Sequence, residues 1–306
     1  MKQNERNKIL FDMAGMNGCL GSSDATYVSM LKLSSWASIG HKGFKLNLPA
    51  RTYNLTVSHS KQILSTTTGH PATWNDKTIV LFDQLLCGVH NGDLFDKNEF
   101  TLYEYDTNGN IVEVKYKGCW FMVDNGYLSW SCTVPPVKDA STYETIRFSE
   151  WLESMRKQVE CSFGIMKQRF STLRHGIRLS SIKRCDQIWI TCCAIHNMLL
   201  FHDDYNNNWN VHEFESCNGS GSNVNLSNDN LFAIMRLHRT ITGNVGNTNS
   251  RVDTHTFNKY VEDGYRVVSK MPLNTFRECL IRHFDIRFKN QSVFWPKHIG
   301  KKPTNI

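Results

Sequence analysis

The stretch RKQVECSFGIMKQRF, Arg156 to Phe170, predicts an amphipathic helix. A helix turns 100° per residue, so apolar residues three and four positions apart share one face. That face extends upstream and holds Trp151, Leu152, Met155, Val159, Phe163, Met166 and Phe170. Glu160 lies off the apolar face, among Arg156, Lys157 and Lys167, where a surface ion pair would explain it. Whether Glu160 has a role beyond such an ion pair depends on acids elsewhere in the chain.

Upstream of this helix, three short segments have the composition of strands: DATYVSML from Asp24, RTYNLTVSHS from Arg51 and KQILSTTTG from Lys61. Each is rich in β-branched or aromatic residues and is bounded by Gly, Pro or Ser. The next segment, Asn75 to His90, predicts a helix capped by Asn75 or Asp76. Its apolar residues recur at helical spacing: Ile79, Phe82, Leu85, Leu86 and Val89.

A hairpin is predicted from Phe100, because FTLYEYDTNGNIVEVKYKG alternates on both sides of TNGN. The strand GCWFMVD follows and ends on Asp124. A loop from Ser129 to Ala140 leads into the helix of Glu160, and Asp186 to His202 is apolar nearly all round, which predicts a buried helix. This order of elements indicates an α/β protein with a mixed sheet covered by helices.

The composition divides the chain into three parts. Residues 1–204 hold the predicted sheet and helices, and residues 205–250 are rich in Asn, Ser and Gly, which is typical of a flexible linker. Residues 251–306 predict a small helical segment whose clearest helix is opened by Pro272.

Composition also indicates the class of protein and its compartment. The 306 residues are 40% hydrophobic, without the long apolar run of a membrane helix or signal peptide, so we expect the nucleus, or the cytoplasm before import. The ten cysteines form no CxxC pair, which favours reduced thiols.

The net charge is +7, and the segment from Arg147 to Arg184 holds nine cations against three acids. Such a segment suits a polyanion, although a solvated charged face has the same composition.

Three acids stand where strands and helix could meet: Asp24 in the first strand, Asp124 at the end of a later strand, and Glu160. Gathering carboxylates is electrostatically costly unless cations compensate, and hard divalent ions bind oxygen ligands. Two such ions about 3.5–4 Å apart can activate a water and stabilise the leaving oxygen of a phosphodiester.

Six segments together resemble, in order, the Harbinger-type DDE transposases, including the group described as plant transposon proteins. They are GCLGSSDATYV, RTYNLTV, GHPATWNDKTIVLFD, FMVDNGYLSW, RFSEWLESMRKQVECSFGIMKQRF and IWITCCAIHNMLL, within Gly15 to His202. The resemblance implies a ribonuclease H-like fold and a metal-dependent endonuclease that also transfers DNA strands. It assigns Asp24, Asp124 and Glu160 as the catalytic acids, with Asp24 bridging two Mg²⁺ or Mn²⁺ ions.

The chain departs from this family in two ways. Many relatives read D-G-T-H where this chain has Asp24, Ala25, Thr26 and Tyr27, and relatives carry a helix-turn-helix before the catalytic core. We therefore keep two hypotheses. One is an active core that cuts transposon ends and target DNA, with a separate Myb-like DNA-binding partner and as a homo-oligomer. The other is a truncated or domesticated interaction protein without catalysis.

Further residues have two interpretations each. Asp76 could cap a helix or support the acids. Arg156, Lys157, Lys167, Arg169 and Arg174 are expected to contact DNA phosphate, and His175 could do so or be a plain loop residue. Cys185, Cys192, Cys193 and His196 could suggest zinc, but without a CxxC pair we favour buried thiols and a hydrogen-bonded histidine. For Trp74 and Trp120 we favour core positions over base stacking.

Overall fold

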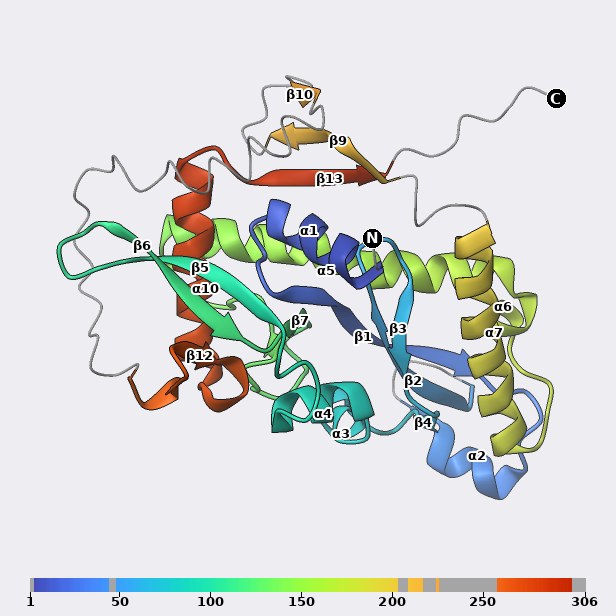
Figure 1. The fold of residues 1–306 in the computed structure, drawn as a ribbon. Helices are drawn as coiled ribbons and strands as arrows, with labels where there is room; N and C mark the ends of the chain where they lie inside the picture. The colour runs from blue at the N-terminus through green and yellow to red at the C-terminus, as the bar shows by residue number, and fades with distance from the viewer. Residues whose placement is uncertain (1–2, 44–47, 203–208, 217–223, 226–257, 299–306) are drawn as a thin grey trace.

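The computed structural model of the protein describes residues 3–43, 48–202, 209–216, 224–225 and 258–298 (Figure 1). Its main sheet has the strand order β3-β2-β1-β7-β8, with β4 also paired to β2. The strands are β1 Cys19–Ser29, β2 Ala50–Val57, β3 Ile63–Thr66, β4 His70–Pro71, β7 Trp120–Met122 and β8 Thr133–Val134.

The direction of these strands identifies the fold. The first three form an antiparallel meander, and β7 and β8 add to the other edge of β1 in parallel. All eight residues of β2 are buried, as expected for a strand inside a covered sheet. The three strands predicted before the first helix are confirmed, and so is the α/β, ribonuclease H-like fold class.

Helices cover both faces of the sheet. Successive side chains of β7 point to opposite faces. Trp120 and Met122 pack with residues of α5 (Tyr143–Arg169), while Phe121 packs with residues of α3 (Asp76–Val80) and α4 (Gln84–Asn91). The long helix α5 therefore lies on one face and the pair α3 and α4 on the other (Figure 1).

The helix predicted over Asn75 to His90 is two helices, so that prediction is wrong in its continuity. Asn75 caps α3 by accepting a hydrogen bond from the Thr78 amide, and Asp83 starts α4 by accepting from the amides of Leu85 and Leu86. The apolar spacing alone would allow one continuous helix. The side chain of Asp83 interrupts it, because it binds backbone amides at the start of α4 and also has a tertiary partner. Phe82, expected in the core, is 54% exposed at the break.

The helix α7 (Ile182–His202) packs beside β2 and β3 through one face only. Its buried residues include Trp189, which stacks on Tyr53 of β2 with ring centroids 4.5 Å apart. The prediction of a helix buried all round is wrong, because Met198 and Phe201 on the outer face are 69% and 76% exposed. The short helices α2 (Ser35–His41) and α6 (Ser171–His175) lie at this end of the molecule (Figure 1).

The predicted hairpin is confirmed as β5 (Glu99–Tyr105) and β6 (Ile111–Lys117). Strand β12 (Tyr265–Val267) pairs with β6 in parallel, and α10 (Leu273–Lys289) packs against β5 and α5. Smaller elements complete this end: β11 Val261–Glu262, η2 Asn258–Tyr260 and η3 Val268–Lys270.

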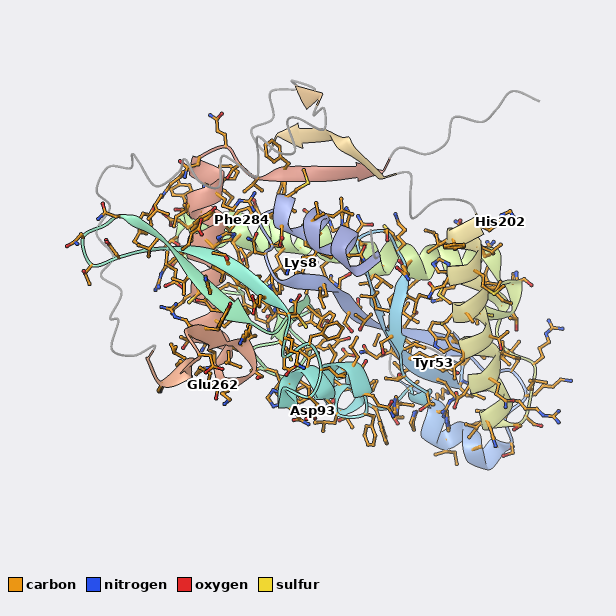
Figure 2. All side chains as sticks on the ribbon, viewed as in Figure 1. Lys8, Tyr53, Asp93, His202, Glu262 and Phe284 are labelled. Carbon is orange, nitrogen blue, oxygen red and sulfur yellow. The ribbon has the colours of Figure 1, made fainter. Side chains whose placement is uncertain are left out.

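The C-terminal helix shares the main hydrophobic core with the sheet. Phe276 and Phe284 of α10 belong to the same buried cluster as Trp120 and Phe148, whereas Tyr53 belongs to the cluster under α7 (Figure 2). Residues from both sides of the predicted boundary at residue 204 thus contribute to one core. Strand β9 (Trp209–Ser216) lies within the expected linker and pairs with β13 (Phe294–His298). Most of that linker lies outside the described residues.

At the start of the chain, α1 (Gln3–Met13), a helix that was not predicted from the sequence, contacts β1 and β13. The two-residue β10 (Val224–Asn225) pairs with β9. The described residues include no helix that is both long and apolar enough to cross a membrane.

Candidate active site

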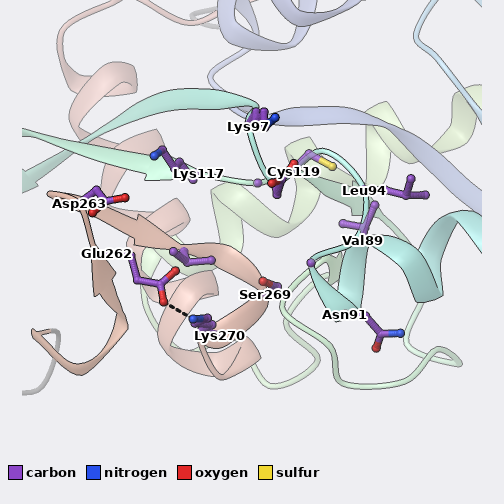
Figure 3. A pocket seen from close by; sticks show the side chains of 14 residues that line it. Val89, Asn91, Leu94, Lys97, Lys117, Cys119, Glu262, Asp263, Ser269 and Lys270 are labelled. Carbon is purple, nitrogen blue, oxygen red and sulfur yellow. Dashed lines mark hydrogen bonds and ion pairs between the residues drawn. The ribbon is translucent and has the colours of Figure 1, made fainter.

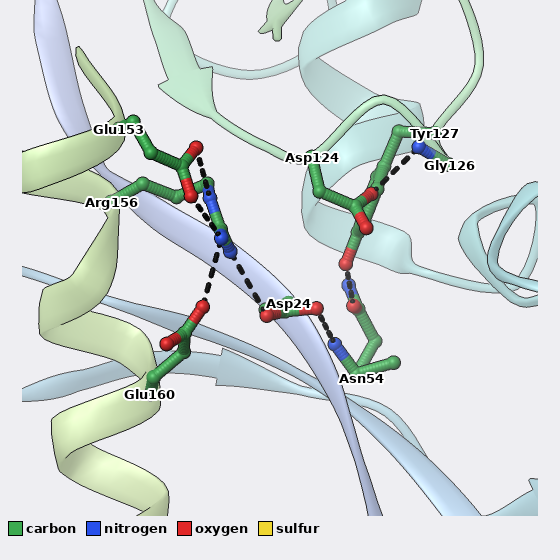
Figure 4. Close-up of polar contacts among 9 residues, drawn as sticks. Asp24, Asn54, Asp124, Gly126, Tyr127, Glu153, Arg156 and Glu160 are labelled. Atoms are coloured by element: carbon green, nitrogen blue, oxygen red, sulfur yellow. Dashed lines mark hydrogen bonds and ion pairs between the residues drawn. The ribbon is translucent and has the colours of Figure 1, made fainter. Parts of the chain in front are cut away.

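The register of two parallel strands brings Asp24 and Asp124 together. Ser22 of β1 pairs with Met122 of β7, and each aspartate lies two residues further along its own chain segment. Side chains two residues apart in an extended segment point to the same face, so the carboxylate of Asp24, in the middle of β1, and that of Asp124, just after β7, lie on the same side of the sheet. Figure 4 shows Asp24 between α5 and the segment that carries Asp124.

The turn after Asp124 fixes its carboxylate. Its Oδ1 accepts a hydrogen bond from the amide of Gly126 at 2.8 Å, the geometry of an Asx turn. A Cβ on Gly126 would lie 3.0 Å from an Asp124 oxygen and 3.0 Å from Oδ2 of Asp76. A side chain at this position would push against both carboxylates, so Asp76 and Asp124 lie beside the same glycine. Asn75, and not Asp76, caps α3.

Glu160 reaches this group through Arg156. The guanidinium of Arg156 donates to Asp24 at 3.1 Å and to Glu160 at 2.8 Å, and it also forms a two-point contact with Glu153 (Figure 4). Its side chain is only 9% exposed. The structure therefore corrects the expectation for Arg156: it faces three carboxylates and not solvent. Glu153 was missed as a member of the site, although its spacing of three residues from Arg156 signals a helical ion pair.

The protonation of Asp24 reflects this environment. Its pKa is raised to about 6, mainly by burial and in part by the nearby carboxylates of Asp124 and Asp76, while the amide of Ala25 and the guanidinium of Arg156 oppose the shift. Hydrogen bonding to Glu153 is the main cause that raises the pKa of Arg156, which remains a cation. Asp24, Asp76 and Asp124 are thus close enough to repel one another.

The donor chemistry of the site fits a hard divalent cation. Carboxylate oxygens are the ligands that Mg²⁺ and Mn²⁺ prefer, and a raised carboxylate pKa marks a place where added positive charge is favourable. Within the described residues, no group of three His, Cys, Asp or Glu is arranged to hold an ion directly. The guanidinium of Arg156 supplies the positive charge between Asp24 and Glu160.

A buried polar network on the opposite face of the sheet supports the site. The amide group of Asn54 donates to Asp83 at 2.7 Å and to Ser23 at 3.0 Å, and its oxygen accepts from the hydroxyl of Tyr127. Asp83 starts α4, and Tyr127 closes the turn that begins at Asp124. The network links the strand of Asp24 to the start of α4 and to the turn after Asp124. No periodicity signals it, because its members are far apart in the sequence.

This network gives a prediction for stability. Changing Tyr127, which is 5% exposed, to Phe leaves the buried oxygen of Asn54 without its donor, which costs about 1–3 kcal/mol. Urea unfolding at fixed pH measures the change. Tyr265→Phe is the matched control, because the hydroxyl of Tyr265 donates to Glu99 at an exposed position and its loss should cost less than about 0.5 kcal/mol. Equal effects of the two substitutions would contradict the role of the network.

The other cations expected to contact DNA differ in accessibility. Lys157, Arg169 and Arg174 are exposed, while Lys167 is half-buried, and burial lowers its pKa. Arg169 also lies 3.4 Å from Nδ1 of His196. Three exposed cations thus follow α5 and α6 away from the acids.

The remaining candidate residues have structural partners. Nε2 of His196 lies 3.0 Å from the carbonyl oxygen of Lys61, and the three cysteines considered with it are buried free thiols. The indole of buried Trp120 donates to the carbonyl of Asn17, as favoured from the sequence. Trp74 is only partly buried, and His175 is exposed.

A hollow of about 400 Å³ lies apart from the acids (Figure 3). It is bordered by the end of α4, the end of β6, and the segment from β11 to η3. Its charged lining residues are Asp96, Lys97, Lys117, Glu262, Asp263 and Lys270. Lys270 pairs with Glu262 across it, so charges of both signs compensate locally.

Comparison with known proteins places these residues in a family. Residues 40–197, just over half of the chain, match the family model described as DDE superfamily endonuclease. The matched range contains Asp76, Asp124 and Glu160 and begins after Asp24. No curated protein and no solved structure gives a match.

Proposed function

The chain belongs to the DDE superfamily endonucleases, and on that premise we propose that it is the catalytic core of a Harbinger-type transposase. Its reaction would be metal-dependent hydrolysis and transesterification of DNA phosphodiesters. The observation that carries the proposal has two parts: the register of β1 and β7 brings Asp124 beside Asp24, and the buried guanidinium of Arg156 joins Asp24 to Glu160 of α5.

The carboxylates of Asp24, Asp124 and Glu160 would hold two Mg²⁺ or Mn²⁺ ions, with Asp76 in support. When bound, such ions activate water and stabilise the leaving oxygen. The residues of this chain orient the acids: the amide of Gly126 fixes Asp124, and the amide of Ala25 fixes Asp24. Arg156 balances their charge and would give up Asp24 and Glu160 to the ions.

DNA would approach along the exposed cations Lys157, Arg169 and Arg174, with Lys167 beside them. Phosphate contacts of this kind bind without sequence preference and weaken as salt rises. The positions of the cations beyond Glu160 on α5 and on α6 support a DNA path that leads to the acids. A Myb-like partner would supply sequence recognition, and we propose that the protein acts in the nucleus as a homo-oligomer.

Nicking of supercoiled plasmid by the purified chain tests the proposal. We expect nicked circles with Mg²⁺ or Mn²⁺ and none with EDTA. A folded chain that binds plasmid but leaves it intact with both metals would instead favour the non-catalytic interaction protein.

The pKa of Asp24 predicts the pH dependence of metal binding. In the unfolded chain this carboxyl titrates near its ordinary value of 3.8, and in the folded metal-free protein near 6. Between these values the folded state binds the extra proton, so the stability of the metal-free protein falls as pH rises. Stabilisation by Mg²⁺ should grow through the same window, because only the carboxylate binds the ion.

Thermal unfolding at pH 5 and pH 7, with Mg²⁺ or EDTA, measures both trends. Burial also raises the pKa of Asp12 to about 6, so the titration of Asp12 contributes to the same pH dependence of stability. The difference between the wild type and Asp24→Asn isolates the contribution of Asp24. Mg²⁺ stabilisation that is equal at both pH values would contradict this role.

A further inference from the structure

Three aromatic rings, those of His70, Trp74 and Phe82, form a compact cluster that reaches from the buried edge of the sheet to the surface. His70 of β4 is 7% exposed, Trp74 is partly exposed, and Phe82 is 54% exposed. Their ring centroids lie 5.3 Å apart in each pair, and the imidazole of His70 is nearly parallel to the indole of Trp74, at 20°. His70 therefore supports the indole from inside the protein.

The aromatic cluster is connected to the active site through the segment of Trp74. Trp74 stands two residues before Asp76, whose carboxylate approaches Asp124 at Gly126. Phe82 stands one residue before Asp83, which is held by Asn54. Trp74 is thus attached to the segment that carries Asp76, and Phe82 to the start of α4.

The exposure of Phe82 results from the tertiary structure. In one continuous helix Phe82 would share the buried face of Ile79 and Leu86, but the cap at Asp83 breaks the helix and turns Leu81 and Phe82 outward, at 57% and 54% exposure. A contiguous exposed apolar patch beside a polar site marks a place of contact. Lys77 of α3 is also exposed near this patch and suits an anionic ligand.

We propose that Trp74 and Phe82 form a stacking platform for an unpaired nucleobase of the DNA strand next to the phosphodiester at the acids. This inference rests on the proposed function, because it takes DNA as the ligand. Aromatic faces stack any base, while a nearby cation contacts the phosphate backbone. The platform would hold a base out of the duplex, so that the adjoining phosphate can reach Asp24 and Asp124.

Equilibrium binding without metal tests the platform. Fluorescence anisotropy compares a labelled oligothymidylate of about 16 nucleotides with an abasic oligonucleotide of equal length, in EDTA. The wild type should bind the thymidylate about tenfold more tightly or better. Trp74→Ala and Phe82→Ala should each remove most of this preference while leaving the salt dependence unchanged, because the phosphate contacts remain.

Two variants make the result specific. Trp74→Phe retains a stacking ring and should keep most of the preference for bases. Tyr143→Ala removes an aromatic ring that is 82% exposed at the start of α5, about 25 Å along the helix from Glu160, and should change nothing. The platform is overturned if the wild type shows no preference for bases, or if folded Trp74→Ala and Phe82→Ala both keep it.

The outcome is separate from that of plasmid nicking. If the chain prefers bases through Trp74 but does not nick plasmid, the platform is supported and the proposed function is refuted. If the chain nicks plasmid but shows no preference for bases, the proposed function is supported and the platform is refuted.

Discussion

Replacement of Asp124 by Asn is expected to abolish DNA cleavage while leaving the protein folded. The amide oxygen of Asn can still accept the hydrogen bond from Gly126, so the turn is kept. The negative charge is lost, and with it one ligand of the proposed ions. Loss of several kcal/mol of transition-state stabilisation predicts a fall in the cleavage rate of at least about 10³-fold.

Plasmid nicking and plasmid binding should be measured on the same preparations of this variant. We expect binding to be retained, because the exposed cations of α5 and α6 are unchanged, and unfolding free energy within about 0.5 kcal/mol of the wild type. Asp139→Asn is the matched control, since Asp139 is exposed in the loop before α5 and should leave nicking intact. Nicking by Asp124→Asn at the wild-type rate would refute the assignment of the acids.

Replacement of Arg156 by Met should have the largest effect on stability. It leaves Asp24, Glu153 and Glu160 facing one another without their common cation. Removing one partner of a buried ion pair costs about 3–5 kcal/mol. The side chains of Glu153 and Glu160 are 39% and 49% exposed, and solvent screens them, so we expect about 2–3 kcal/mol without metal.

The same variant reports on the metal. Added Mg²⁺ should stabilise Arg156→Met more than the wild type, because the ion needs to displace no guanidinium from Asp24 and Glu160. Thermal unfolding with Mg²⁺ and with EDTA measures the difference. Lys157→Met, a change of the neighbouring exposed cation, should alter stability by less than about 0.5 kcal/mol and leave the response to Mg²⁺ unchanged. An Arg156→Met protein as stable as the wild type in EDTA would contradict the role of this residue.

Local sequence patterns were sufficient to predict an element where a single type of contact decides its structure. The alternation around TNGN predicted β5 and β6, and the spacing from Trp151 to Phe170 predicted most of α5, since each element buries one face and is bounded by its own turn or cap. The position of Asp124 after a strand was also readable. The pairing of that strand with β1 was not, because register depends on residues far apart in the chain.

Prediction failed where long-range polar contacts compete with local periodicity. Asn54 holds Asp83, and this contact accompanies the break between α3 and α4 that exposes Phe82. Burial of Arg156 could not be inferred from its helix alone, because one of its three carboxylate partners, Asp24, comes from β1.

The sequence by itself determined the order of the main strands and helices, the amphipathic face of α5 and the types of residue that carry the chemistry. Only the tertiary structure decided that Asp24 and Asp124 lie side by side on neighbouring chain segments, that Arg156 joins Asp24 to Glu160, and that Asp76 approaches Asp124 at Gly126. The physical reason is the range of the interactions. Periodicity and capping act within a few residues, whereas burial and charge act on whatever the fold brings together.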